Sequence, residues 1–98
     1  MLRKTYVQPQ EVMLLKANIN YTEFHFENGE VLLISKTLKS FQNTFHQYGF
    51  VRINKSDMIN VQYLTSTRAK YSYVTLTNNL ELSVSRRRRK DVKNMVLS

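Results

Sequence analysis

The stretch from Tyr21 to Ser35, YTEFHFENGEVLLIS, decides the fold class of this chain. From residue 21 to 27 the side chains alternate, so that both phenylalanines fall on one side of an extended backbone. Asn28-Gly29 follows, which is a strong short-range signal for a hairpin turn, and residues 31–35 supply a returning strand. The stretch therefore predicts an antiparallel β-hairpin.

Similar short runs extend outward from this hairpin in both directions. Asn78-Asn79 predicts a second hairpin turn, which joins a strand at 71–77 to a strand at 80–84. The segment at 17–20 is predicted to be a loop, and a polar segment at 65–70 is predicted to interrupt the extended chain. The runs that predict strands are residues 11–16, 50–53, 58–66, 71–77 and 80–84.

The segment from residue 36 to 48 changes to a helical period. Leu38, Phe41 and Phe45 recur at spacings of three and four, which predicts a short amphipathic helix. Ser35 or Thr37 is expected to cap its start.

A second helix is predicted at residues 91–97, where Val92, Met95 and Val96 share one face. With about eight short strands and no βαβ rhythm, the chain is expected to be mainly β and mostly antiparallel. It should contain one short internal helix and a C-terminal helix.

Length and composition predict one domain at residues 10–98, preceded by a polar lead-in at residues 1–9. The chain has no cysteine, which excludes disulfides and thiolate metal sites. Its first residues lack a long apolar run, so we expect a cytoplasmic protein without a secretory signal or a membrane span.

The charge is strongly asymmetric. Fifteen Lys and Arg against seven Asp and Glu give a net charge of +8. Residues 1–50 hold five basic and four acidic side chains, whereas residues 51–98 hold ten basic and three acidic ones. The second half therefore carries +7 of the total, which favours a polyanionic partner.

Five consecutive cations, Arg86 to Lys90, follow Ser85 at the end of a predicted strand. Ser85 is expected to cap the C-terminal helix, so the cations fall where the helix dipole disfavours positive charge. A solvated helix face would mix charges of both signs, and this run contains no acid. We therefore expect phosphate contact here.

Enzymatic chemistry is not predicted. His25 and His46 lie on different elements without metal-ligand spacing, and Ser56-Asp57 has no histidine nearby in sequence. Neither a glycine-rich phosphate loop nor a carboxylate pair is present. We expect no metal, cofactor or small-molecule substrate.

Two other features have open interpretations. Asn54-Lys55-Ser56 is either a polar turn bonded to its own backbone or a set of donors projected toward a ligand. Tyr71 and Tyr73, near Arg68 and Lys70, could stack on bases, which gives the alternative of an RNA or single-stranded nucleic-acid binding module. A module that binds an acidic protein is a third possibility.

The chain resembles the LytTR family of DNA-binding domains, which are usually attached to bacterial response regulators of two-component systems. The resemblance is carried by FVRINKSDMINV at residues 50–61 and by LSVSRR at residues 82–87, with looser similarity from residue 10 onward. Asn54, Asp57 and Ser83 depart from the family pattern, in which His is common at the first of these positions and Pro at the last.

The resemblance implies an elongated stack of small sheets whose loops enter successive major grooves of double-stranded DNA. It further implies a direct-repeat promoter site that binds two copies, with transcription regulation as the function. By position, Lys55 and Arg86 match base-reading residues, as does Asn20 in the loop from Lys16 to Tyr21. The expected phosphate contacts are Lys16, Asn54, Ser56, Arg87, Arg88, Arg89 and Lys90.

Overall fold

The predicted hairpin at residues 21–35 is present in the computed structural model, which describes residues 7–98. Strand β2 (Tyr21–Phe26) pairs antiparallel with β3 (Val31–Ile34). Gly29 adopts a φ of 92°, a left-handed conformation that glycine accepts without strain. Residues 1–6 of the predicted lead-in lie outside the described part.

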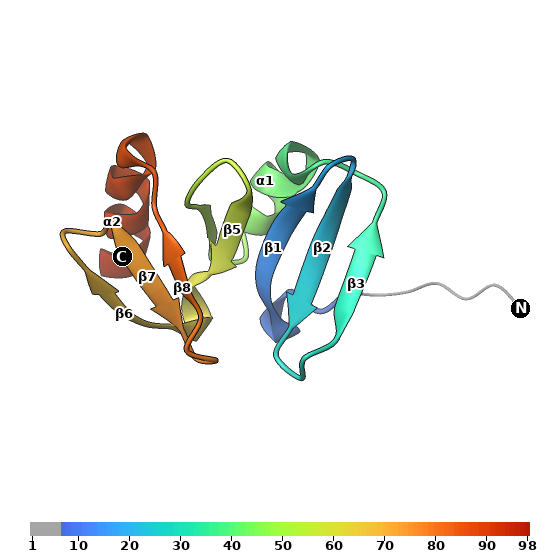
Figure 1. Cartoon of the computed structure of the whole chain (residues 1–98), viewed down its shortest axis with the longest axis horizontal. Helices are drawn as coiled ribbons and strands as arrows, with labels where there is room; N and C mark the ends of the chain where they lie inside the picture. The colour runs from blue at the N-terminus through green and yellow to red at the C-terminus, as the bar shows by residue number, and fades with distance from the viewer. Residues whose placement is uncertain (1–6) are drawn as a thin grey trace, which may run out of the picture.

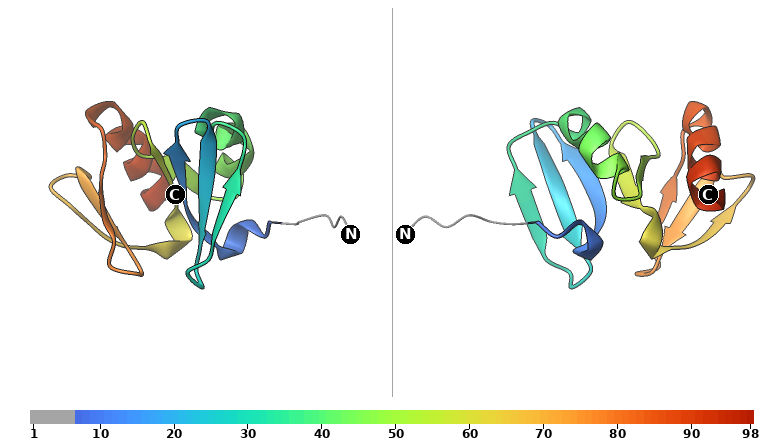
Figure 2. Two further views of the ribbon diagram at one scale, coloured as in Figure 1. Left: turned by 45° about the vertical axis from the view of Figure 1, so that its right-hand side comes forward. Right: turned by 180° about the vertical axis from the view of Figure 1, so that it is seen from behind.

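The described residues form two antiparallel sheets and two α-helices, which confirms the predicted mainly β fold (Figure 1). One sheet has the order β3-β2-β1-β5-β4, and the other has the order β6-β7-β8. The molecule is elongated, with extents of 49 × 24 × 22 Å, and the sheets follow one another along its length (Figure 2). The remaining strands are β1 (Val12–Asn18), β4 (Phe50–Arg52), β5 (Asp57–Asn60), β6 (Leu64–Arg68), β7 (Tyr73–Leu76) and β8 (Glu81–Ser83).

Strands β1, β4 and β5 bury most of their residues because both of their faces are covered. One face packs against helix α1 (Leu38–His46), in a core that includes Phe24, Phe45 and Phe50. The opposite face meets the second sheet and helix α2 (Arg89–Leu97), in a core that includes Ile59 and the fully buried Val92. Alternate residues of one strand thus enter different cores.

Both predicted helices are present. In α1 the helical spacing places the Phe41 and Phe45 ring centroids 5.9 Å apart, and the Phe41 centroid lies 5.1 Å from that of Phe24 in β2, both pairs in an edge-to-face arrangement. Thr37 occupies the N-cap position, but its side chain makes no capping hydrogen bond, and its carbonyl instead accepts from the Ser40 hydroxyl at 2.6 Å.

The prediction of one strand at residues 58–66 was wrong, because the chain passes from one sheet to the other within these residues. Strand β5 ends at Asn60, a 3-10 turn η2 (Val61–Tyr63) follows, and β6 then joins the other sheet. The buried Asn60 amide fixes this change of direction, since its oxygen accepts from the backbone N–H of Gln62 at 3.0 Å and its nitrogen donates to the Val12 carbonyl at 2.9 Å. The polar segment predicted at 65–70 belongs to β6 as far as Arg68, because a mostly exposed edge strand keeps polar side chains.

The loop predicted at residues 17–20 was also too long. Strand β1 continues through Ala17 to Asn18, which pairs with Tyr21. Only Ile19 and Asn20 remain as a two-residue turn, and Ile19 adopts a φ of 57°. Pairing with β2 extends β1 beyond its apolar run, which the local sequence alone did not indicate.

Candidate nucleic-acid interface

The turn between β4 and β5 is built around the side chain of Asn54. Its amide oxygen accepts from the backbone N–H groups of Ser56 at 2.7 Å and Asp57 at 2.9 Å. Its amide nitrogen donates to the Asp57 carboxylate at 3.0 Å and to the Ser83 carbonyl at 2.8 Å. The amide of Asn54 is therefore engaged inside the protein, whereas Lys55 at the tip is exposed.

The side chain of Arg52 holds the same turn through hydrogen bonds to its backbone. Its guanidinium donates to the carbonyls of Asn54 at 3.1 Å and Lys55 at 2.6 Å, and to the Gln42 side chain at 3.0 Å. Burial lowers the pKa of Arg52, and the neighbouring charges of Arg88 and Arg87 lower it further. The turn thus lies within a concentration of positive charge.

Arg52 was missed as a site residue because its role is to position its neighbours. The only signal in the sequence is a charged residue at the C-terminal end of a mostly buried strand, directly before a polar turn. Such a residue needs several partners, and backbone carbonyls of the turn supply them.

The cationic run begins where β8 ends and is joined directly to the Lys55 turn. The backbone N–H of Ser85 donates to the Ile53 carbonyl at 2.8 Å, beside the bond from Asn54 to Ser83. Residues that are 29 positions apart in sequence are therefore fixed against each other.

Ser85 does not cap the C-terminal helix as predicted. A 3-10 turn, η3 (Arg86–Arg88), precedes α2, and the Ser85 hydroxyl makes no capping bond to it. The N-cap position of α2 is Arg88. The residues directly after Ser85 thus form a separate 3-10 turn, in which the Ser85 carbonyl accepts from the backbone N–H of Arg88 at 2.9 Å, and the α-helix itself begins at Arg89.

The predicted contacts of the run differ in exposure. Arg86, Arg87 and Lys90 are exposed, whereas Arg88 and Arg89 are half-buried. Arg88 lines a groove between α1 and α2. The exposed side chains are the ones free to meet a ligand without rearrangement.

The turn between β1 and β2 supplies the third predicted contact region. Asn20 is exposed at its tip. Lys16 lies in β1 and not in a loop, and its ammonium pairs with the Asp57 carboxylate at 3.1 Å. The backbone N–H of Ala17 donates to the Ser56 carbonyl at 2.7 Å, which joins this region to the Lys55 turn.

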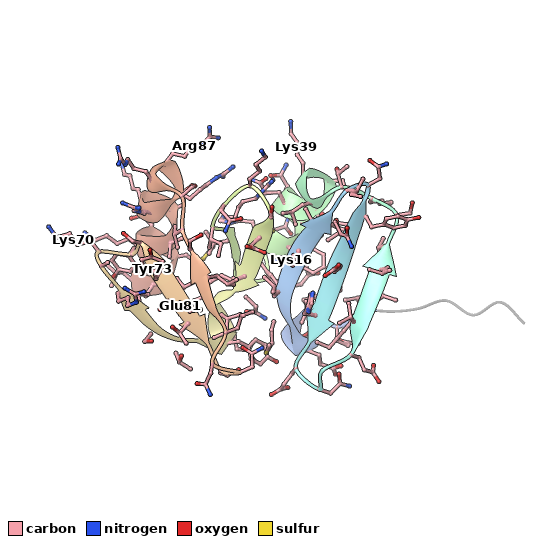
Figure 3. The ribbon with its side chains drawn as sticks, viewed as in Figure 1. Lys16, Lys39, Lys70, Tyr73, Glu81 and Arg87 are labelled. Carbon is pink, nitrogen blue, oxygen red and sulfur yellow. The ribbon has the colours of Figure 1, made fainter. Side chains whose placement is uncertain are left out.

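The β1–β2 turn, the β4–β5 turn and the start of η3 all lie along one long edge of the molecule (Figure 1). Arg87 and Lys39 both point outward from this edge, and Lys39 comes from the start of α1 (Figure 3). Lys39 was not predicted, because a lysine on the polar face of an amphipathic helix carries no distinguishing signal. We call this surface the cationic edge.

A second group of cations lies at the end of the molecule beyond the cationic edge. Lys70 projects from the β6–β7 connection, where Ala69, Lys70 and Tyr71 all adopt left-handed φ values of 53–66° (Figure 3). Lys70 and Tyr71 line a hollow together with residues from the start of α2, namely Arg89, Lys90 and Lys93. The hollow is lined by four cations and one aromatic ring.

The tyrosines considered for base stacking have different surroundings. The Arg68 guanidinium lies 4.0 Å from the centroid of the Tyr73 ring and also pairs with the Glu81 carboxylate at 2.8 Å. One face of Tyr73 is therefore already covered by a cation within the protein. Tyr71 is half-buried like Tyr73, packs against the core that contains Val92, and lines the hollow together with Lys70.

Within residues 7–98, no group of three or more His, Cys, Asp or Glu side chains is arranged to hold a metal ion. No helix in this part of the chain is long and apolar enough to cross a membrane. His25 instead shares a hydrogen bond of 2.9 Å with Glu23, which together with Asn18 lowers the pKa of the Glu23 carboxyl.

Comparison with known proteins identifies relatives of this architecture. The family model of the LytTr DNA-binding domain matches residues 3–97. A similar solved structure is the LytTr DNA-binding domain of a methyl-accepting/DNA response regulator from Bacillus cereus. It superposes with a TM-score of 0.79 at 19% identity, over 92% of this chain and 84% of that one. Comparison with curated proteins finds no match.

Proposed function

The chain belongs to the LytTr DNA-binding domain family, and we propose that it binds double-stranded DNA in a sequence-specific manner as part of a bacterial transcription regulator. The observation that carries this proposal is the cationic edge, where three turns from distant parts of the sequence project in one direction. Its partner would be a promoter site made of direct repeats, with one copy of the chain on each repeat.

The dimensions of the molecule suit contact with successive major grooves. The long axis measures 49 Å, whereas one helical turn of DNA spans about 34–36 Å. Turns spread along this axis can therefore reach two grooves on the same side of a duplex. The hydrogen bonds between the β4–β5 turn and the β8–η3 junction keep two of the contact regions in a constant relation.

The contacts divide into base readers and phosphate anchors. Lys55 and Arg86 are exposed at the turns, and their donors suit the O6 and N7 acceptors of guanine. Asn20 suits adenine, while Arg87, Arg88, Arg89 and Lys90 would neutralise phosphates. Lys16 and Ser56 are proposed as phosphate contacts at the margin of the site. Asn54, whose amide is engaged within the turn, is better suited to positioning Lys55.

Replacing Arg86 by Ala tests whether the contacts divide into base readers and phosphate anchors. Affinity for the specific duplex should fall by about 1–3 kcal/mol, and base preference at one position should relax. The matched control is Arg87→Ala, an exposed neighbour in the same 3-10 turn. It should weaken specific and random duplexes equally and reduce the salt slope by about 0.9. Equal loss on both duplexes for Arg86→Ala would contradict its base-reading role.

Competition between duplex and single strands separates this proposal from the stacking alternative. Preference for the single strand, lost on Tyr71→Ala, would overturn it in favour of the alternative. Binding that survives high salt without any response to nucleic acid would point instead to an acidic protein partner.

A further inference from the structure

Ile19 occupies an unusual place at the tip of the β1–β2 turn. It is the first residue of a two-residue turn and adopts a φ of 57°. It is also 90% exposed, compared with 67% for Leu97, the next most exposed large apolar side chain among residues 7–98. Neither hydrophobic core includes it.

Folding alone does not account for isoleucine at this position. A β-branched side chain in the left-handed region is strained, and glycine, asparagine or aspartate adopts that conformation at lower cost. Exposure of a large apolar group adds nothing to the stability of the fold. A strained residue that contributes nothing to the core is a candidate for a functional contact.

The turn presents Ile19 rigidly toward the side where DNA is proposed to bind. The pairing of Asn18 with Tyr21 closes the turn, and the Asn18 side chain donates to the Glu23 carboxylate at 2.8 Å. The Ala17 bond to Ser56 fixes the end of β1 to the Lys55 turn. The β1–β2 turn lies on the cationic edge (Figure 1), and both of its residues, Ile19 and Asn20, are exposed.

The major groove of DNA offers an apolar side chain one specific partner, the 5-methyl group of thymine. Resting on the proposed function, we infer that Ile19 packs against a thymine methyl group and adds a preference for thymine under the β1–β2 turn. Asn20, the next residue, can read an adjacent adenine through its N6 and N7 atoms. The turn would then read an A·T-containing step by one apolar and one amide contact.

Removal of the methyl group from the DNA tests this inference directly. The probe is the duplex that the wild-type chain selects from a random pool, with each thymine replaced in turn by uracil. At one position in each repeat, uracil should weaken wild-type binding about fourfold, the effect of burying one group of methylene size. Ile19→Ala should bind the thymine and uracil duplexes equally.

Ile19→Gly adds a measurement of stability, the unfolding temperature of the variant in the absence of DNA. Because glycine accepts the left-handed conformation, this variant should unfold at the same or a higher temperature than the wild type, so a loss of thymine preference cannot come from misfolding. Uracil effects that are absent from wild type at every position, or that persist unchanged in Ile19→Ala, would overturn the inference.

Failure of the proposed function gives a different result. In that case the random pool yields no preferred duplex, and Lys55→Ala and Arg86→Ala bind every duplex as the wild type does. Sequence preference that depends on Arg86 but not on any thymine methyl group would reject the role of Ile19 alone.

Discussion

Replacing Asn54 by Ala should separate a positioning role from a direct DNA contact. The substitution removes four hydrogen bonds of 2.7–3.0 Å, which join the turn to itself, to Asp57 and to Ser83. Each bond contributes about 0.5–1.5 kcal/mol net, and water replaces part of the loss because the turn is half-exposed. We therefore expect the free energy of unfolding to fall by about 2–4 kcal/mol.

Thermal and urea unfolding followed by circular dichroism measure this change. For a domain of this length, the expected loss corresponds to a decrease in Tm on the order of 10 to 25 °C. Lys55→Ala is the matched control, because its exposed side chain lies in the same turn and makes no hydrogen bond within the described residues. The control should keep the wild-type Tm while losing affinity for the specific duplex.

Binding to DNA, measured at a temperature where the variant is folded, completes the test. Asn54→Ala should lose sequence preference, because both the Lys55 turn and its link to Ser83 are released. If Asn54 instead contacts phosphate, all duplexes should bind equally less well and Tm should stay unchanged. If Asn54→Ala lowers the free energy of unfolding by less than about 0.5 kcal/mol, which is usual for surface substitutions, the positioning role is refuted.

Two further substitutions test other parts of the structure. Ser85→Ala should change the free energy of unfolding by less than about 0.5 kcal/mol in urea titrations, because the hydroxyl makes no capping bond. A loss above 1 kcal/mol would restore its predicted role as a cap. Asn60→Ala should cost about 2–4 kcal/mol by the same measurement, since it leaves the buried Val12 carbonyl without its donor and opens a small cavity. Wild-type stability would show that the change of sheets does not depend on this amide.

The sequence predicted those parts of the fold that depend on neighbouring residues. Both hairpins and both helices follow from turn residues and side-chain periodicity within short windows. The change of sheets after Asn60 was not predictable in this way, because the bond that fixes it reaches Val12, 48 residues away. Apolar and polar residues alternate from Ile59 to Tyr63, which favours one continuous strand and gives no local indication of the change.

In the candidate site, too, the features that depend on contacts distant in sequence could not be predicted. Lys55 and Arg86 were proposed from charge and from family resemblance, and the elements that carry them, the β4–β5 turn and η3, both lie on the cationic edge (Figure 1). The supporting role of Arg52 and the link from Asn54 to Ser83 depend on contacts between strands that are distant in sequence. Such contacts follow from the register of the sheets, which composition and spacing do not determine.

The two bonds that join Ile53 and Asn54 to the β8–η3 junction have a consequence for helical phase on DNA. Under the proposed function, they fix how many base pairs separate the bases read by Lys55 from those read by Arg86. Insertion of one base pair between these bases would rotate one contact by roughly 34–36° about the duplex axis, since a turn holds 10–10.5 base pairs. The protein cannot follow that rotation without breaking both bonds, so it should tolerate changes of base within a half-site far better than changes of length.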